Sequence, residues 1–318
     1  MTQTLVHRYQ PRGTARAMFV DKSPEILMSG PAGTGKSRAC LEKVHYYALQ
    51  YPHFRGLIMR KTAASLGASA LATWRKYVIP EAFQAGITWY YGGSSEEPPQ
   101  YRYENGSAVM IGGMDKATRI MSTEYDIIFA QEAIEFTDED WESANTRLRN
   151  GVLPFQQLLA DTNPSAPLHW LKQRCDKGAC KLYFSTHEEN PVYFDEQGNV
   201  TPAGAAYMAR LDALTGVRYK RLRKGLWVAA EGVIYEDWDE SVHVIDPFPI
   251  PDDWPRFWVV DFGFVNPFVC QMWAQTPDGQ LIMYREIYRT NKLVEEHCVD
   301  DHPFTAAGVG MPARAWMK

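Results

Sequence analysis

The sequence has no apolar run of the roughly 18 residues that a membrane-spanning helix requires. Its opening segment carries His7, Arg8, Arg12 and Arg16 but no apolar stretch, so we expect no secretory signal peptide. Only five cysteines occur in 318 residues, scattered and odd in number, which indicates reduced cytosolic thiols. These absences argue against a membrane protein and against a small secreted domain held by disulfides.

An excess of positive charge is also missing, because 38 acidic residues outnumber 33 basic ones and the formal net charge is −5. The chain as a whole is therefore not a basic coat for nucleic acid, although a local basic track along DNA is compatible with this charge. Apolar residues make up 45% and charged residues 22%, as is typical of globular proteins. The length suits one large domain or two smaller ones.

Apolar runs alternate with helical patterns through the first two-thirds of the chain. This alternation predicts an α/β fold with a mostly parallel sheet. An Asn-Gly pair at 105–106 predicts a tight turn within a β-excursion at the sheet edge. Thr137 and Asp140 predict a capping box at the start of a helix. The expected strands are 24–29, 56–59, 87–91, 108–111, 125–130, 155–160 and 182–185, and the expected helices are 37–50, 63–76, 139–149 and 203–214.

Four prolines fall within residues 246–255, where they remove backbone donors and exclude regular structure. We interpret this segment as a linker between a domain at 1–245 and a second region at 256–318. Three strand-like runs follow it, at 258–262, 268–274 and 281–288.

One segment matches the phosphate-binding pattern G-x-x-x-x-G-K-[ST] in full, between an expected strand and an expected helix. Glycines let successive backbone N–H groups point at phosphate oxygens, and the helix adds its positive end. Lys36 would neutralise the β- and γ-phosphates of ATP, and the Ser37 hydroxyl would bind Mg²⁺. The residues expected to bind nucleotide here are Gly30, Pro31, Ala32, Gly33, Thr34, Gly35, Lys36 and Ser37.

A second acidic site is expected at the end of a neighbouring buried strand, and the run at 125–130 ends in Gln131 and Glu132. Glu132 is our candidate general base for the attacking water. Gln131 stands where many such ATPases have the aspartate that holds Mg²⁺ through a water. Its amide oxygen can still accept from a metal-bound water, though without charge, so Gln131 is a candidate Mg²⁺ residue and we expect weaker Mg²⁺ binding rather than inactivity. Alternatively, Glu132 is a helix-start carboxylate that complements the helix dipole. A third strand ends near Asn163, which would sense the γ-phosphate unless Asn163-Pro164 is simply a turn.

The order of these motifs resembles one family, the large terminase subunits of tailed bacteriophages, over about residues 9–288. Tyr9-Gln10 is similar to the family's adenine-contacting segment, which makes Gln10 a nucleotide-binding candidate. The other segments that carry the resemblance are 60–62, 125–132, 161–164, 185–191, 214–232 and 259–263.

This resemblance implies a RecA-like P-loop ATPase domain followed by an RNase H-like nuclease domain. The implied activity is Mg²⁺-dependent ATP hydrolysis that drives double-stranded DNA into procapsids in the host cell cytoplasm. The implied partners are the portal protein, the small terminase subunit and further copies of the chain in a ring of five. In such rings a neighbour's arginine completes the site. Arg119 is our candidate for this finger, and a solvated surface arginine is the alternative.

The nuclease of this family holds two Mg²⁺ or Mn²⁺ ions with three or four carboxylates. Asp261 resembles the first of these, and Glu286 on a later strand is a second candidate. Only 63 residues follow Pro255 and no acidic residue follows Asp301. We therefore expect an incomplete, C-terminally truncated nuclease domain without activity in this chain alone.

Two rival interpretations remain. A host helicase-like DNA-repair ATPase shares the phosphate-binding loop but does not explain the nuclease-like strand. A non-hydrolysing nucleotide-binding scaffold is prompted by Gln131 and by the expected loss of the nuclease. A basic cluster at 218–224 either grips DNA phosphates or complements a helix C-terminus.

Overall fold

The computed structural model describes residues 6–67, 69–229, 243–264, 266–291 and 315–317. The chain divides into two units, Met1–Gly232 and Val233–Lys318. In the described residues, no helix is long and apolar enough to cross a membrane.

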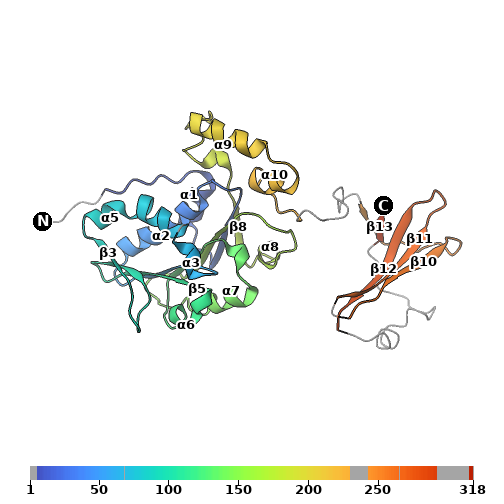
Figure 1. The fold of residues 1–318 in the computed structure, drawn as a ribbon, viewed down its shortest axis with the longest axis horizontal. Helices are drawn as coiled ribbons and strands as arrows, with labels where there is room; N and C mark the ends of the chain where they lie inside the picture. The colour runs from blue at the N-terminus through green and yellow to red at the C-terminus, as the bar shows by residue number, and fades with distance from the viewer. Residues whose placement is uncertain (1–5, 68, 230–242, 265, 292–314, 318) are drawn as a thin grey trace. The chain divides into compact units, whose positions relative to one another are not determined.

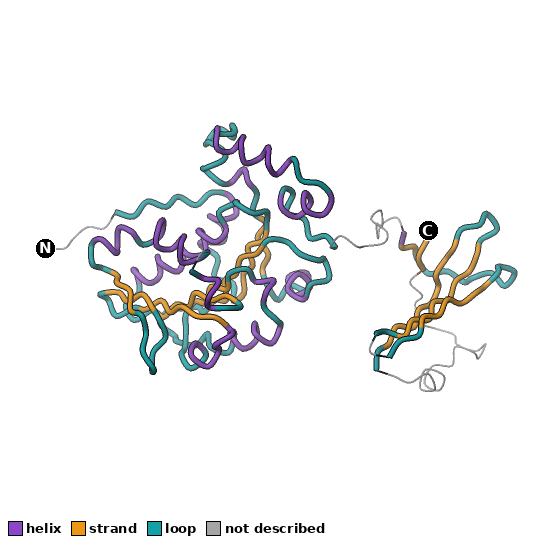
Figure 2. Tube along the Cα trace, in the orientation of Figure 1, coloured by secondary structure: helices purple, strands orange, loops and turns teal. Residues whose placement is uncertain are grey.

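An eight-stranded mixed sheet forms the centre of the first unit (Figures 1 and 2), with the order β3-β4-β5-β2-β6-β7-β1-β8. The strands from β5 to β8 in this order run parallel to their neighbours, whereas β3 and β4 add antiparallel pairs at one edge. The strands are β1 (Glu25–Ser29), β2 (Arg55–Arg60), β3 (Thr88–Tyr91), β4 (Gln100–Tyr103), β5 (Ala108–Gly113), β6 (Ile127–Ala130), β7 (Gln157–Thr162) and β8 (Lys181–Phe184).

Helices cover both faces of this sheet, which explains why its central strands are continuous apolar runs rather than alternating ones. Ile26 and Met28 of β1 pack in one layer with α1 (Gly13–Val20), α2 (Lys36–Gln50), α3 (Ala63–Leu66) and α4 (Ala70–Thr73). Leu27 packs in the opposite layer with α6 (Ala117–Ile120), α7 (Asp138–Asn145) and α8 (Trp170–Asp176). Figure 1 shows α1 and α2 on one side of the sheet and α6 and α7 on the other.

The remaining helical segments of the first unit are short or lie beyond the sheet. A π-helical turn η1 (Trp74–Val78) and α5 (Pro80–Gln84) follow α4. The described part of this unit also contains the 3₁₀ turns η2 (Met114–Lys116), η3 (Ala133–Glu135) and η4 (His187–Glu189). After β8 the chain forms α9 (Pro202–Asp212) and α10 (Gly216–Leu222).

The predicted parallel α/β organisation is confirmed, and so is the edge excursion, in which Gly106 adopts a φ of 81° in the turn between β4 and β5. The capping box is confirmed too, since Thr137 and Asp140 exchange side-chain and backbone hydrogen bonds. The predicted helix at 63–76 was wrong as one element, because it is divided into α3, α4 and η1.

The second unit contains an antiparallel sheet with the order β10-β11-β12-β13-β9. The three strand-like runs predicted after the prolines are confirmed as its three long strands, and β11 buries alternate residues, as a sheet with one covered face requires. The strands are β9 (Val244–Ile245), β10 (Arg256–Asp261), β11 (Phe268–Gln275), β12 (Leu281–Arg289) and β13 (Ala315–Met317).

Candidate nucleotide site

The loop between β1 and α2 has the backbone geometry that its glycines permit. Gly33 and Gly35 have φ angles of 82° and 90°, in the left-handed region that side chains with a Cβ disfavour. The 15-residue helix α2 begins directly after the loop, so the positive end of the helix dipole faces the loop. The expected order of strand, glycine-rich loop and helix is therefore present, with the loop formed by Gly30, Pro31, Ala32, Gly33, Thr34 and Gly35.

Lys36 is buried, and its ammonium group lies over this loop. Its Nζ donates to the carbonyl oxygens of Gly30 at 2.9 Å and of Pro31 at 2.6 Å. It also donates to Asn163 Oδ1 at 3.3 Å, which places Asn163 beside the loop as expected. Burial lowers the pKa of Lys36, and neighbouring carboxylates partly oppose this shift. A cation next to a helix N-terminus suits this place to an anionic ligand.

Asp161, on β7, connects Ser37 of α2 with the segment that follows β6. The Ser37 hydroxyl donates to Asp161 Oδ2, and the Glu132 backbone N–H donates to Asp161 Oδ1 at 3.1 Å. Asp161 is only 3% exposed, and burial raises the pKa of its carboxyl. The sequence motif at 161–164 contains Asp161, but reasoning from sequence placed the acidic group on the neighbouring strand and missed this contact.

Glu132 is half-buried and has a φ of 52°, a left-handed conformation that is uncommon for a residue other than glycine. Such a backbone costs on the order of 1–3 kcal/mol and persists where surrounding contacts impose it, often at functional sites. Burial raises the pKa of Glu132, and the negative charge of Asp161 raises it further. Glu132 precedes η3, a turn of only three residues, and its side chain forms no cap hydrogen bond there. The helix-start alternative therefore has little support.

Gln131 forms its side-chain hydrogen bonds with residues at the start of α4. Its Oε1 accepts hydrogen bonds from Ser69 Oγ at 2.7 Å and from the Ala70 backbone N–H at 3.2 Å. Gln131 is thus held at the start of α4, and only 5% of it is exposed.

Residues that follow β8 hold the outer side of the phosphate-binding loop. His187 Nε2 lies 2.9 Å from the Ala32 carbonyl oxygen, and Asn190 Nδ2 donates to the Gly33 carbonyl oxygen at 2.6 Å. Burial lowers the pKa of His187, which favours a neutral ring that donates from Nε2. Tyr207 of α9 also donates to Ala32. The sequence analysis gave His187 no role, although the segment at 185–191, which carries part of the family resemblance, was the signal that could have identified this one.

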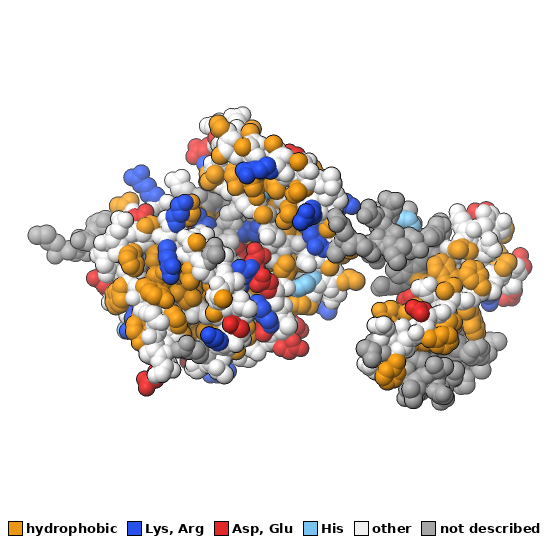
Figure 3. Space-filling model, in the orientation of Figure 1, with side chains coloured by type: hydrophobic (Ala, Val, Ile, Leu, Met, Phe, Trp, Pro, Cys, Tyr) orange, Lys and Arg blue, Asp and Glu red, His pale blue; other side chains and the backbone are white. Residues whose placement is uncertain are grey.

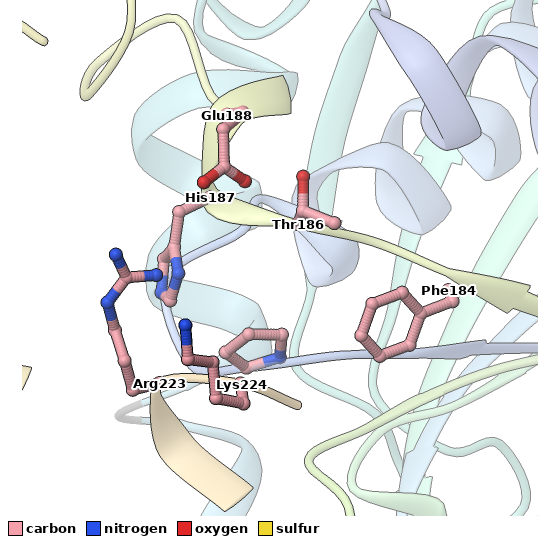
Figure 4. Close-up of a pocket in the computed structure, with 7 residues that line it drawn as sticks. Phe184, Thr186, His187, Glu188, Arg223 and Lys224 are labelled. Carbon is pink, nitrogen blue, oxygen red and sulfur yellow. The ribbon is translucent and has the colours of Figure 1, made fainter. Parts of the chain in front are cut away.

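A pocket of about 180 Å³ adjoins the loop on this side (Figure 4). Glu188 lines the pocket together with two cationic side chains, Arg223 and Lys224. Arg223 also donates to Asp212 at 2.7 Å. The negative charge of Glu188 and the positive charge of Arg223 make the pocket suited to polar ligand groups. The residues that line it are Pro31, Phe184, Thr186, His187, Glu188, Arg223 and Lys224.

The basic cluster at 218–224 divides into two sets. Arg221 and Arg223 form local hydrogen bonds, to the Val228 carbonyl oxygen and to Asp212 respectively. Arg218, Lys220 and Lys224 are exposed, and Figure 3 shows basic side chains on the surface of this helical part. Lys224 Nζ lies 5.7 Å from the centre of the Tyr219 ring. Because the charged groups of this set are exposed, it is the better candidate for phosphate contacts.

The N-terminal segment runs past α2 toward the loop after β8. The Arg38 guanidinium lies 5.3 Å from the centre of the Tyr9 ring, and Thr14 donates its backbone N–H to Glu189 at 3.0 Å. Gln10 lies between these contacts and is exposed, so its amide is accessible to a ligand.

The remaining candidate residues belong to other elements of the chain. Arg119 belongs to α6, and its side chain is outside the described part of the chain. In the second unit, Glu286 pairs with Gln271, which pairs with Val259, two residues before Asp261. Asp261 and Glu286 therefore share one face of the sheet. Within the described residues, no three His, Cys, Asp or Glu side chains gather as a metal site would require.

The comparisons with known proteins agree with this arrangement. The phage terminase large subunit family matches residues 22–199, which is more than half of the chain. No curated protein matches the sequence. Among solved structures, a large terminase from a thermophilic bacteriophage is similar at 18% identity with a TM-score of 0.54, covering 91% of this chain and 72% of that one. The same terminase in complex with ADP gives 17% identity and a TM-score of 0.54, with the same coverage.

The ATPase domain of the Thermus phage P74-26 large terminase, as a single-residue mutant, matches at 13% identity with a TM-score of 0.51. This match covers 69% of the present chain and 95% of that domain. At such identities the likeness establishes the α/β fold alone. The family match, which spans the phosphate-binding loop, Glu132 and Asn163, establishes membership: this chain belongs to the phage terminase large subunit family.

Proposed function

We propose that the chain is the ATP-hydrolysing motor of a DNA-packaging machine, in which Mg²⁺-dependent ATP hydrolysis moves double-stranded DNA into a procapsid. One observation carries this proposal. Lys36, Ser37, Glu132 and Asn163 converge around a glycine-rich loop at the carboxyl edge of a mostly parallel sheet. Ligands of open α/β sheets bind at this edge. We accordingly propose that the first unit is a RecA-like ATPase domain.

Each residue has a role that its position supports. Backbone N–H groups of the loop and Lys36 would bind the phosphates, with Asn163 responding to the γ-phosphate. Ser37 offers a hydroxyl beside a buried carboxylate, a set of hard oxygen donors that fits Mg²⁺. When bound, that ion would neutralise phosphate charge. Glu132 would orient a water and accept its proton, since burial makes it more basic than an ordinary glutamate. Gln10 would contact the adenine ring of ATP.

The remaining proposals concern the assembly. We propose a ring of five chains on the portal protein, loaded with DNA by the small terminase subunit in the host cell cytoplasm. Arg119 would reach a neighbour's nucleotide from α6. Arg218, Lys220 and Lys224 would contact DNA phosphates, and their positive charge supports that role.

In the second unit, Asp261 and Glu286 would belong to an RNase H-like nuclease site that binds Mg²⁺ or Mn²⁺. Their shared sheet face supports this assignment. They supply two of the three or four carboxylates that a two-metal nuclease uses, and in the described residues no third acidic, histidine or cysteine side chain joins them.

The test is ATP turnover by the wild type and by Lys36→Ala, each with and without double-stranded DNA. We expect DNA to stimulate the wild type, and Lys36→Ala to reduce turnover by about 10²-fold or more, the scale of losing one charge-stabilising group. Lys22→Ala is the matched control, because Lys22 is an exposed lysine on the surface. A wild type that binds ATP but does not turn it over, even when concentrated with DNA, would support the scaffold interpretation.

A further inference from the structure

Gln131 and Asp161 occupy equivalent places on neighbouring strands. Ala130 of β6 pairs with Ala160 of β7 in parallel register, so Gln131 and Asp161 are the next residues of the two strands. The two side chains nevertheless have different partners, since Gln131 contacts α4 and Asp161 contacts Ser37 of α2. Of these two side chains, Asp161 is the one that accepts a hydrogen bond from the hydroxyl that would bind Mg²⁺.

The hydrogen bonds of Gln131 leave it little capacity for a metal site. An amide oxygen has two lone pairs. One faces the Ala70 N–H and the other faces Ser69 Oγ, whose single hydroxyl proton is shared with the Ser65 carbonyl oxygen. To hold a metal-bound water, Gln131 would have to release one of these donors while remaining 5% exposed. A neutral amide would also supply no charge in return.

Asp161, in contrast, carries a charge and has unused acceptor positions. A carboxylate has about four acceptor positions, and the Ser37 hydroxyl and the Glu132 N–H use two of them. Among the described residues, no Lys, Arg or His lies within ion-pair distance of Asp161, although only 3% of this residue is exposed. The positive charges of Lys36 and Arg60 act on the carboxylate from a greater distance. A buried carboxylate is costly unless a cation or several hydrogen bonds compensate it. A divalent cation next to Ser37 would provide that compensation.

We propose that Asp161, rather than Gln131, is the carboxylate that holds Mg²⁺ with Ser37. The acidic group is thus supplied from β7, one strand closer to the phosphate-binding loop than the position expected from the sequence pattern. The inference rests on the proposed ATPase function and specifies its metal site. Asp161 would act directly on the ion or on a water bound to it, and the same carboxylate holds the backbone of Glu132.

The test measures metal binding rather than turnover. A fluorescent, non-hydrolysable ATP analogue is titrated into the full chain with Mg²⁺ and, separately, with EDTA. Mn²⁺ replaces Mg²⁺ in a parallel experiment, in which electron paramagnetic resonance reports the bound ion. The variants are Asp161→Asn, which is nearly isosteric, and Gln131→Ala, which removes the competing candidate.

We expect the wild type to bind the analogue more tightly with Mg²⁺ than with EDTA. Asp161→Asn should weaken Mn²⁺ binding by about 10- to 100-fold, the range for contacts that support a metal, and should keep its affinity in EDTA. Gln131→Ala should retain the wild-type difference between Mg²⁺ and EDTA. Wild-type Mn²⁺ affinity in Asp161→Asn, or loss of the Mg²⁺ effect in Gln131→Ala, would overturn the proposal.

Two further outcomes are informative. If Asp161→Asn does not fold, Gln131→Ala decides alone, because the proposal requires its metal dependence to persist. If the wild type binds the analogue in neither buffer, the proposed ATPase function itself is refuted. Metal-dependent binding that persists in Asp161→Asn would instead refute only the role of Asp161.

Discussion

Replacing Glu132 by glutamine separates a catalytic role for this residue from a structural one. Glutamine has nearly the same shape and keeps the backbone N–H that donates to Asp161 at 3.1 Å. The left-handed backbone at φ 52° restricts glutamate and glutamine equally, because both side chains begin with a Cβ. The substitution therefore removes the charge and the basicity and leaves the surrounding contacts in place.

The magnitude follows from these contacts. A positioned general base contributes about 10²- to 10⁴-fold to a rate. The glutamine oxygen still accepts a hydrogen bond from water, so we expect turnover to fall by about 10²- to 10³-fold, or about 3–4 kcal/mol in the barrier. ATP binding should be retained, because Lys36 and the loop are untouched.

The thermal stability of Glu132→Gln should rise although its turnover falls. Burial and Asp161 raise the pKa of Glu132, so its charged form is less favourable in the folded chain than in the unfolded chain. This penalty grows as pH rises past the ordinary carboxyl pKa and is complete once pH exceeds the raised pKa of Glu132. A neutral amide removes the penalty. We therefore expect Glu132→Gln to unfold at a higher temperature than the wild type at pH 7.

The assays are steady-state ATP turnover, equilibrium ATP binding and thermal unfolding, with Glu139→Gln on the exposed side of α7 as the control. Turnover within about threefold of the wild type would show that Glu132 is not the base, because a base contributes at least about 10²-fold. A lower unfolding temperature would refute the electrostatic reasoning.

Two predictions concern the stability of the first unit. Glu25→Gln should lower the free energy of unfolding at pH 7 by about 2–3 kcal/mol, because Arg174 donates to Glu25 at 2.6 and 2.7 Å and remains beside it after the change. Hydrogen bonds from Arg174 lower the pKa of Glu25 despite its burial. The difference in unfolding free energy between the wild type and Glu25→Gln, measured by urea titration, should therefore shrink as pH falls below about 4. A difference that stays constant with pH would contradict this reasoning. Burial lowers the pKa of Lys43 to about 8, so the wild type should gain stability relative to Lys43→Met as pH rises from about 8 toward the ordinary lysine pKa near 10. A wild type that instead loses stability relative to this variant over the same range would show that Lys43 is not deprotonated by burial.

Much of the fold could be predicted because its signals are local. The central strands are continuous apolar runs, and the capping box of Thr137 and Asp140 needs only three residues of spacing. Strand β4 was not predicted, because its sequence, Gln100 to Tyr103, is polar and aromatic although most of it is buried. The helix predicted at 63–76 is divided, since α3 ends at Leu66 and α4 begins at Ala70, and Trp74, which packs in the core, then starts the π-helical turn.

The sequence by itself determined the phosphate-binding loop, since glycines, lysine and serine at fixed spacing between a strand and a helix specify it locally. It also determined that an acidic side chain follows a buried strand near that loop. Only the tertiary structure decided which carboxylate faces Ser37. The sheet order places β7 between β6 and β1. Gln131 accepts hydrogen bonds from Ser69 and from the backbone of α4, whereas Asp161 accepts one from Ser37. Strand order and side-chain partners depend on contacts between residues that are distant in sequence, and no local pattern encodes them.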